Sequence, residues 1–411
     1  MKRFAFRACL AGIAIFFFIL LIGVSGAASA IQSDNVLWSQ TYAGNDGHSC
    51  MAIARTTDGG YVIGGQSYNG TIATAYMART DEKGSLRWIN NSIPGSNAFY
   101  DVTALPDGSF AFVGSYGGVS TGSIQQGLLV KTDADGRQVF ARTYGAEGDL
   151  YLSRVLAADD GNLMVLGLVS NISEGGTQRS YVYLLKIDAA GNALWSRLYG
   201  GAYGLNCQGF ANAAAGGYAI AGSVTNIERG SIEAYLLMVD RNGDRLWDAH
   251  YPGPGYITIA SLCSAGDDGF LLGGGISNGR TNDIYVLRVA SNGTYLWNRT
   301  YEAKGIAYDV LPGPDGGFVL ACGWNVTVLD SSGGAVWTRD FGTGEHALNC
   351  ITEAADGSYV FGGWTEASDG NVAQWLIGIG STKGSGATCW PAITLPLIAV
   401  AAIAIRRRRL R

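Results

Sequence analysis

Two tryptophans and three polar residues in the last quarter of the chain are the side chains best suited to bind a sugar. Trp324 lies in a short connection between two predicted strands, and Trp364 opens a loop that also contains Glu366, Asp369 and Asn371. Indole rings stack on the apolar faces of sugars, and carboxylates and amides hydrogen-bond to hydroxyls. These five residues form the candidate ligand-binding set. The alternative is that both indoles fill space between neighbouring repeats.

Histidine and cysteine occur together twice, as His48 with Cys50 and His346 with Cys350. Imidazole and thiolate are zinc ligands, but neither spacing matches a strong zinc signature, so we predict no metal site. Cys50 and Cys350 would meet only if the two ends of the chain come together, and only their measured separation can support a disulfide. Cys50, Cys207, Cys263 and Cys350 all occupy the same kind of predicted strand, where small buried side chains are needed, which favours structural thiols for most of them.

Known catalytic patterns are missing from the sequence. It contains no nucleophile elbow, paired-carboxylate motif, phosphate-binding loop or metal-binding helix. We therefore predict no catalytic residue and no cofactor. Carboxylates that come together from separate repeats stay open, because sequence spacing does not reveal them.

The elements that would position these side chains belong to a repeat. The pattern Asp-x-x-Gly-x-x-x-aromatic occurs six times in the sequence, and Ala replaces Asp in one copy. The copies are Asp81-Gly84-Trp88, Asp133-Gly136-Phe140, Asp188-Gly191-Trp195, Asp240-Gly243-Trp247, Ala290-Gly293-Trp297 and Asp330-Gly333-Trp337. Successive aromatics are 52, 55, 52, 50 and 40 residues apart, close to the ~40–50 residues of a four-stranded propeller blade.

Seven tight turns predict seven blades. Each turn carries Asp-Gly or a close variant, in which Gly supplies the positive φ that closes a hairpin. The turns are Asp58-Gly59, Asp107-Gly108, Asp160-Gly161, Ala215-Gly216, Asp268-Gly269, Asp315-Gly316 and Asp356-Gly357. Third strands such as residues 183–187 are almost continuously apolar, so we expect both of their faces to be buried.

The aromatic of the repeat lies in the fourth strand. There Trp195, Arg197 and Tyr199 share one face, and the same pattern recurs in three other repeats. A guanidinium between two rings gains ~0.5–2 kcal/mol by cation–π contact. Because the pattern recurs, we interpret it as packing between blades and not as an active site.

The way the ring closes follows from an orphan strand. Trp38 lies in a fourth strand with no first three before it, whereas no such strand follows Lys383. We therefore predict an all-β, seven-bladed β-propeller over residues 31–384, in which the N-terminal strand completes the last blade and leaves no open edge. The structural aromatics of the repeat are Trp38, Trp88, Phe140, Trp195, Trp247, Trp297 and Trp337.

Both ends of the chain predict export. Residues 1–30 combine basic residues, an apolar run and a final Ala28-Ser29-Ala30, which is typical of a cleaved signal peptide. Residues 385–405 form a small-residue linker and an apolar segment, and the arginine-rich tail 406–411 follows, so we expect a transmembrane helix with the tail in the cytoplasm. This layout also resembles prokaryotic sorting signals, so cleavage and lipid attachment at or before Cys389 stay open.

Charge and sequons describe the surface. Without both ends, 20 basic residues face 33 acidic ones, which leaves a net charge of −13. Such a surface repels phosphate backbones, and we predict no nucleic-acid partner. Candidate N-glycosylation sequons are Asn69, Asn90, Asn171, Asn292, Asn298 and Asn325.

The repeat from residue 36 to about 384 resembles the tryptophan-docking repeats of pyrroloquinoline-quinone-like propellers. The resemblance implies a propeller whose indoles hold adjacent blades together. The chain departs from the quinoprotein dehydrogenases of that group in having seven repeats rather than eight and no adjacent cysteines, so their quinone and calcium sites do not carry over. The chain is also similar to exported prokaryotic surface propellers, common in archaea.

Two functions compete. The first is a non-catalytic cell-surface protein, anchored by its C-terminal segment, that binds a glycan or protein or contributes to the envelope. The second is an extracellular enzyme acting on polysaccharide with carboxylates from several blades. If no two carboxylates lie within ~5–10 Å of each other in the channel mouth, glycoside hydrolysis by the usual carboxylate pair is excluded.

Overall fold

The computed structural model describes residues 36–380, apart from 43–46, 69–72, 91–94, 118–123, 175–176, 203, 267–268, 342–345 and 367–371. The predicted signal peptide, the 385–405 segment and the arginine tail lie outside this range. Within it, no helix has the length and hydrophobicity needed to cross a membrane.

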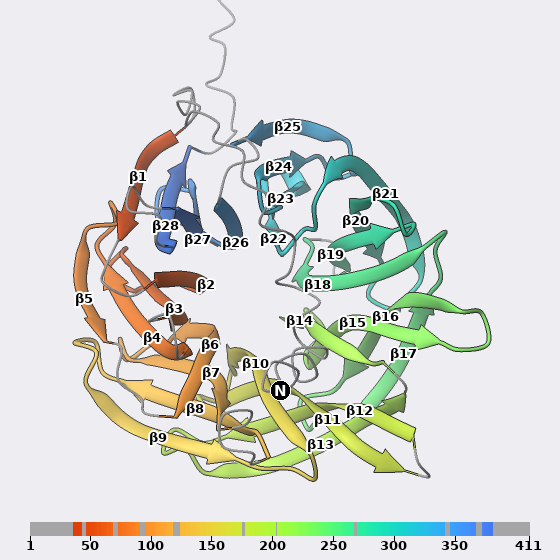
Figure 1. The fold of residues 1–411 in the computed structure, drawn as a ribbon, viewed down its shortest axis with the longest axis horizontal. Helices are drawn as coiled ribbons and strands as arrows, with labels where there is room; N and C mark the ends of the chain where they lie inside the picture. Colours follow the sequence, from red (N-terminus) through yellow and green to blue (C-terminus); the bar gives the residue numbers. More distant parts are fainter. Residues whose placement is uncertain are drawn as a thin grey trace, which may run out of the picture.

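The described residues form seven antiparallel sheets of four strands each, arranged around a central opening (Figure 1). We number the sheets as blades one to seven in chain order. Blade one comprises β2 (Gly47–Arg55), β3 (Tyr61–Tyr68), β4 (Ala73–Thr80) and β5 (Leu86–Asn90). Blade two comprises β6 (Ser96–Ala104), β7 (Phe110–Tyr116), β8 (Gln126–Thr132) and β9 (Gln138–Tyr144). Blade three comprises β10 (Asp149–Ala157), β11 (Leu163–Glu174), β12 (Thr177–Ile187) and β13 (Ala193–Ala202).

Blades four to six repeat the plan, with the innermost strand first and the outermost strand last. Blade four comprises β14 (Asn206–Asn212), β15 (Tyr218–Asn226), β16 (Ser231–Val239) and β17 (Arg245–Tyr251), and blade five comprises β18 (Tyr256–Ser264), β19 (Phe270–Ser277), β20 (Asn282–Val289) and β21 (Tyr295–Lys304). Blade six comprises β22 (Asp309–Pro312), β23 (Phe318–Ala321), β24 (Asn325–Leu329) and β25 (Ala335–Asp340). The short 3-10 turn η2 (Pro314–Gly316) lies between β22 and β23.

The two ends of the propeller meet in blade seven. This blade contains β26 (His346–Glu353), β27 (Tyr359–Glu366), β28 (Val372–Ile379) and, as its outer strand, β1 (Val36–Tyr42). Strand β1 pairs with β28 in antiparallel register, with Trp38 opposite Gly378. The predicted closure by the N-terminal strand is confirmed, and it supplies the partner that the edge of β28 would otherwise lack.

Six of the seven predicted turns have the expected glycine conformation. Gly59, Gly108, Gly161, Gly216, Gly316 and Gly357 have φ between 74° and 88°. The exception is Gly269 in blade five, whose φ is not positive. Residues 267–268, which complete that predicted turn, are not described.

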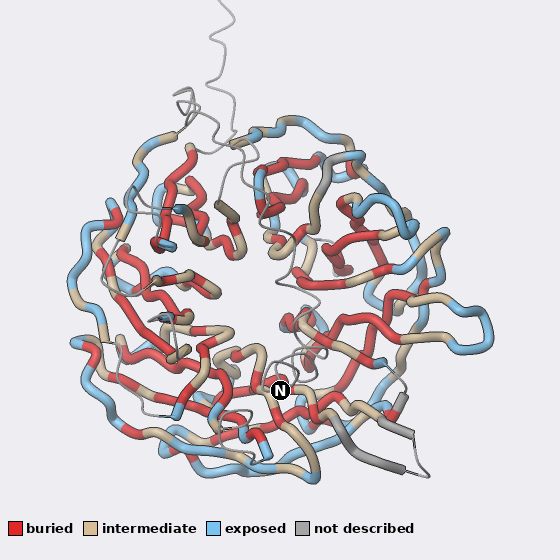
Figure 2. Tube along the Cα trace, in the orientation of Figure 1, coloured by how far each residue is buried: buried red, intermediate tan, exposed pale blue. Residues whose placement is uncertain are grey.

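The core lies between the blades. The described residues form seven apolar clusters, one at each blade-to-blade interface. Strand β12 shows why the third strands are continuously apolar: Tyr183 and Leu185 pack toward blade two, whereas Val182 and Leu184 pack toward blade four. Figure 2 shows the result, with buried middle strands and largely exposed outer strands.

The repeated aromatics dock onto the next blade. A Cβ atom at Gly136 would lie 2.9 Å from two ring atoms of Trp88, and the other five glycines of the repeat face the aromatic of the preceding blade in the same way. The tyrosine four residues beyond the aromatic adds a hydrogen bond, as Tyr144 Oη donates to Gly191 O at 2.9 Å and Tyr301 Oη to Gly333 O at 2.6 Å. This contact explains why the glycine never varies.

The arginines of the fourth strands lie over these rings, as predicted. The guanidinium carbon is 5.4–5.6 Å from a ring centroid for Arg142, Arg197, Arg299 and Arg339. Arg339 lies over Phe341 and the other three lie over the first aromatic of their own strand. The recurring Trp-Arg-Tyr face is therefore part of the scaffold.

Candidate functional site

Trp324 and Trp364, the predicted sugar-stacking pair, flank one strand. Gly323 forms an isolated antiparallel bridge to Leu348 of β26, and Leu348 pairs with Gly363 on its other side. The residues that follow each glycine are Trp324 and Trp364, so the two indoles come from segments on either side of β26. The structure thus brings blade six and blade seven together at this point by backbone hydrogen bonds of 2.8 and 3.1 Å.

The two indoles differ in exposure. Trp324 is 36% exposed, and its carbonyl accepts a hydrogen bond from Phe341 N. Trp364 is half-buried, and Glu366 at the end of β27 is exposed. Asp369 and Asn371 lie outside the described residues, so the full predicted set stays a prediction.

The predicted glycosylation sites fall in different environments. Asn292 is exposed in a turn, and Asn90 and Asn298 are half-buried on outer strands. Asn325 is only 6% exposed, and its side chain accepts a hydrogen bond from Thr327 Oγ1, so a glycan there would require this part of β24 to open. Asn69 and the side chain of Asn171 are not described.

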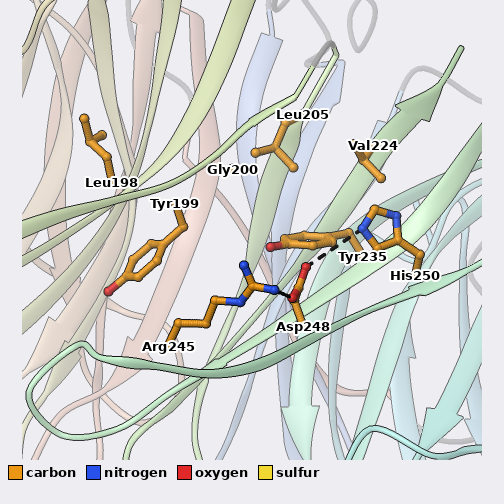
Figure 3. Close-up of a pocket in the computed structure, with 9 residues that line it drawn as sticks. All are labelled: Leu198, Tyr199, Gly200, Leu205, Val224, Tyr235, Arg245, Asp248 and His250. Atoms are coloured by element: carbon orange, nitrogen blue, oxygen red, sulfur yellow. Dashed lines mark hydrogen bonds and ion pairs between the residues drawn. The ribbon is translucent and has the colours of Figure 1, made fainter.

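A pocket that the sequence did not single out lies between blades three and four. Its volume is about 440 Å³, within the ~300–1,000 Å³ of small-molecule sites. Leu205, Val224 and the ring of Tyr235 form an apolar floor, and Tyr199 closes one side. Figure 3 shows Arg245, Asp248 and His250 of β17 projecting over this floor.

The charged groups of this pocket are held by one another. Arg245 and Asp248 form an ion pair, and His250 Nε2 lies 4.0 Å from Asp248 Oδ2. On its other side, His250 Nδ1 lies 3.7 Å from Oε2 of Glu233, a buried carboxylate. Burial and the nearby Asp248 carboxylate raise the pKa of Tyr235 well above its usual value.

Glu233 is fixed from below the pocket. Its Oε1 accepts hydrogen bonds from Asn226 Nδ2 at 3.0 Å and from Ser231 Oγ at 3.4 Å, and Arg229 Nη1 lies 3.4 Å away. The Tyr235 ring, directly opposite His250 in the β16–β17 register, meets the imidazole edge to face at 5.2 Å. The pocket therefore presents positioned donors and acceptors beside an apolar surface.

A departure from the repeat marks this pocket in the sequence. The position two residues after the aromatic is Arg in four blades, but blade four has Ala249 there and has polar side chains at the adjacent positions, Asp248 and His250. These two side chains lie on the opposite face of β17, toward blade three. An alignment of the seven repeats with one another would have shown that Asp248 and His250 depart from the pattern.

A second cavity, of about 190 Å³, lies in the central channel. All seven innermost strands line it, and its charged residues are Asp101, Arg154 and Asp309. Arg154 Nη2 reaches from blade three to Ala260 O in blade five at 3.3 Å. Asp101 Oδ2 accepts from Val155 N at 2.8 Å, so this carboxylate ties blade two to blade three.

Asp309 plays the equivalent role between blades five, six and seven. It accepts from Ser261 Oγ at 2.8 Å and from Ile351 N at 3.0 Å. Burial raises the pKa of Asp101 to about 6 and raises that of Asp309, although the Arg154 guanidinium opposes both shifts. The open hypothesis of carboxylates from separate blades thus gains two residues that the sequence did not identify.

The other predicted chemistry concerns the histidines. His48 packs edge to face on Tyr76 and His346 on Trp375. Among the described residues, no three His, Cys, Asp or Glu side chains are arranged to hold a metal ion.

No protein-family model and no curated protein matches the chain. Solved structures show the fold. A protein of unknown function from Dyadobacter fermentans has 10% identity and a TM-score of 0.51, covering 84% of this chain and 98% of that one. A chain of a mitotic checkpoint complex has 10% identity and a TM-score of 0.55, covering 87% and 97%. A puromycin hydrolase has 16% identity and a TM-score of 0.53, covering 78% of this chain and 50% of that one. At these identities, the likeness identifies the chain as a seven-bladed β-propeller similar to bacterial and eukaryotic propellers.

Proposed function

We propose that this protein is a non-catalytic binding propeller that takes a neutral saccharide in the pocket between blades three and four. One observation carries the proposal: the pocket combines an apolar floor with Arg245, Asp248 and His250, all held in place by neighbouring side chains. A carboxylate beside a guanidinium can hydrogen-bond adjacent hydroxyls, while the Tyr235 floor accepts the apolar face of a sugar ring.

The charge balance of the pocket favours a neutral ligand. Arg245 is paired with Asp248, and Arg229 lies 3.4 Å from Glu233, so neither a strongly anionic nor a strongly cationic ligand would be preferred. The acidic surface of the whole propeller, at net charge −13 without its two ends, also disfavours anionic polymers.

Binding of the purified protein to a panel of neutral mono- and oligosaccharides by calorimetry tests the proposal. We expect Asp248→Asn and His250→Ala each to weaken binding at least tenfold, because each removes hydroxyl partners. Asp244→Asn changes an exposed carboxylate just before the same strand and should leave binding unchanged.

A further variant separates the two candidate sites. Trp324→Ala removes the exposed indole between blades six and seven. If this variant loses binding and Asp248→Asn does not, the site is the one predicted from sequence, and the pocket is not the binding site. If no saccharide binds, the proposed function is wrong.

We further propose that the propeller acts at the cell surface. The apolar segment 385–405 followed by arginines, the export sequence at residues 1–30 and the sequons support an external, membrane-anchored location. Proteolysis of intact cells tests this: a protease added outside should digest the propeller.

The second candidate, a polysaccharide-acting enzyme, is favoured by the central cavity alone. Asp101 and Asp309 line it together, and the raised pKa of Asp101 suits a general acid. Release of reducing ends from envelope polysaccharide by wild type, and its loss in Asp101→Asn, would establish this activity.

A further inference from the structure

The interface that closes the propeller contains two cysteines whose sulfurs are in contact. Cys50 lies on β2 of blade one and Cys350 on β26 of blade seven, 300 residues apart in sequence. Their Sγ atoms are 3.4 Å apart, and the two side chains are 0% and 4% exposed. Both belong to the apolar cluster that joins the last blade to the first.

Gly362 provides the space for both sulfurs. A Cβ atom at this position on β27 would lie 2.6 Å from Cys50 Sγ and 2.9 Å from Cys350 Sγ. Because glycine has no side chain, the two sulfurs share the space that a side chain would fill. They therefore meet over one point of the blade seven sheet, and only ~1.4 Å of approach separates them from the ~2.05 Å of a disulfide bond.

The cysteine pair is specific to the closing interface. In six of the innermost strands, the pairing with the second strand of the blade shifts register, and the two residues on either side of such a shift define equivalent positions in the blades. The position of Cys50 corresponds to Phe99, Leu152, Cys207, Ile259 and Leu348, and the position of Cys350 corresponds to Ala52, Asp101, Arg154, Gly209 and Ser261. The closing interface alone, among these described positions, has cysteine on both sides.

We propose that Cys50 and Cys350 form a disulfide that covalently closes the propeller ring. The two thiols lose two protons and two electrons to a disulfide-bearing oxidant, which is reduced to two thiols as the Cys50–Cys350 bond forms. The bond would tie the first innermost strand to the last, so the ring could not open between blades one and seven. This inference does not depend on the proposed saccharide site, and export would supply the oxidising environment.

The timing of the reaction follows from burial. Thiolates are the reactive species in disulfide exchange, and burial raises the pKa of Cys350 well above its usual value. The bond should therefore form while blades one and seven are still apart, or during transient opening. Oxidation of folded, reduced protein should be slow and should accelerate in mild denaturant.

Oxidative refolding tests the proposal. The full chain is unfolded with reductant and refolded with reduced and oxidised glutathione. Free thiols are then blocked, and the protein is digested without reduction for mass spectrometry. We expect a linked peptide pair containing Cys50 and Cys350, two fewer reactive thiols per chain than in the reduced protein, and a thermal unfolding midpoint that falls when reductant is added.

Cys207→Ala is the matched control, since Cys207 occupies the equivalent of Cys50 in blade four and is equally buried, at 1% exposed. This variant should keep the linked peptide and the sensitivity to reductant, whereas Cys50→Ala should lose both. Natively folded wild-type protein with unlinked Cys50 and Cys350 after oxidation, or with a bond to another cysteine, would overturn the proposal. The wild-type measurement decides the matter even if Cys50→Ala fails to fold.

Discussion

Docking of each repeat aromatic on the glycine of the next blade can be tested by a single methyl group. In blade two, Gly136 has φ 81° and faces Trp88, whose ring atoms would lie 2.9–3.0 Å from a new Cβ. Gly108 of the same blade has φ 80° and has no atom within 4 Å of a new Cβ. The pair therefore has the same backbone conformation and differs in whether an indole is docked there.

The expected magnitudes follow from this difference. Alanine in the left-handed region costs about 1–2 kcal/mol, and both variants incur this cost. Gly136→Ala must also displace the indole, which is held by a 3.2 Å hydrogen bond from Trp88 Nε1 to Ala134 O. Overpacking of this kind costs about 1–3 kcal/mol. We expect Gly136→Ala to lose about 2–5 kcal/mol of unfolding free energy and Gly108→Ala about 1–2 kcal/mol.

Guanidinium unfolding of both variants, followed by tryptophan fluorescence and circular dichroism, measures the difference. The two probes should give coincident transitions, because the comparison assumes cooperative unfolding. Equal losses for Gly136→Ala and Gly108→Ala would refute the docking argument, since the left-handed backbone would then account for the whole effect.

Three further predictions concern single groups. The folded-state pKa of Asp101, about 6, exceeds its unfolded value of 3.8. The free energy of unfolding should therefore fall by on the order of 2–3 kcal/mol as the pH rises from about 4 to above 6. Asp101→Asn should flatten this pH dependence in unfolding measured across that window, and an unchanged slope would contradict the prediction. Tyr301→Phe removes the 2.6 Å hydrogen bond to Gly333 O and should cost about 1 kcal/mol in urea unfolding, whereas no loss would show that the ring alone docks. Ala290→Asp should restore the carboxylate that accepts backbone hydrogen bonds in the other five repeat turns, and should raise the free energy of unfolding by about 0.5–2 kcal/mol. A lower unfolding midpoint would count against this role of the aspartate.

That last prediction rests on the turns themselves. Asp188 Oδ1 accepts from the backbone N–H groups of Ala190 and Asn192 at 2.9 and 2.8 Å, and the other repeat aspartates do the same. In the deviant copy, Asn292 Oδ1 accepts from Thr294 N at 3.0 Å. The asparagine satisfies one donor from a neighbouring position, which explains how this turn keeps its shape without the aspartate.

Most of the fold could be predicted because its determinants are local and repeated. Glycines at fixed spacing specify turns, continuous apolar runs specify strands buried on both faces, and the missing partner strands around Trp38 and after Lys383 specify how the ring closes. Among the described turns, the departure at Gly269 concerns one turn and leaves the strand pairing intact.

The candidate pocket could not be predicted because its residues become neighbours only through packing. Val224, Tyr235 and Asp248 lie on three strands of blade four, and Tyr199 comes from blade three. The prediction concentrated on exposed tryptophans, since aromatic rings are visible in a sequence, whereas the apolar floor of a pocket resembles any other core.

The sequence by itself therefore determined the seven blades, the order of their strands and the closure of the ring, because each depends on turn chemistry and hydrophobic periodicity within one repeat. Only the tertiary structure decided that Asp101 and Asp309 share the central cavity, that Asp248 and His250 overlie an apolar floor, and that Cys50 touches Cys350. The physical reason is that a propeller brings together residues from different blades at distances set by the geometry of the ring, and no spacing along the chain encodes those distances.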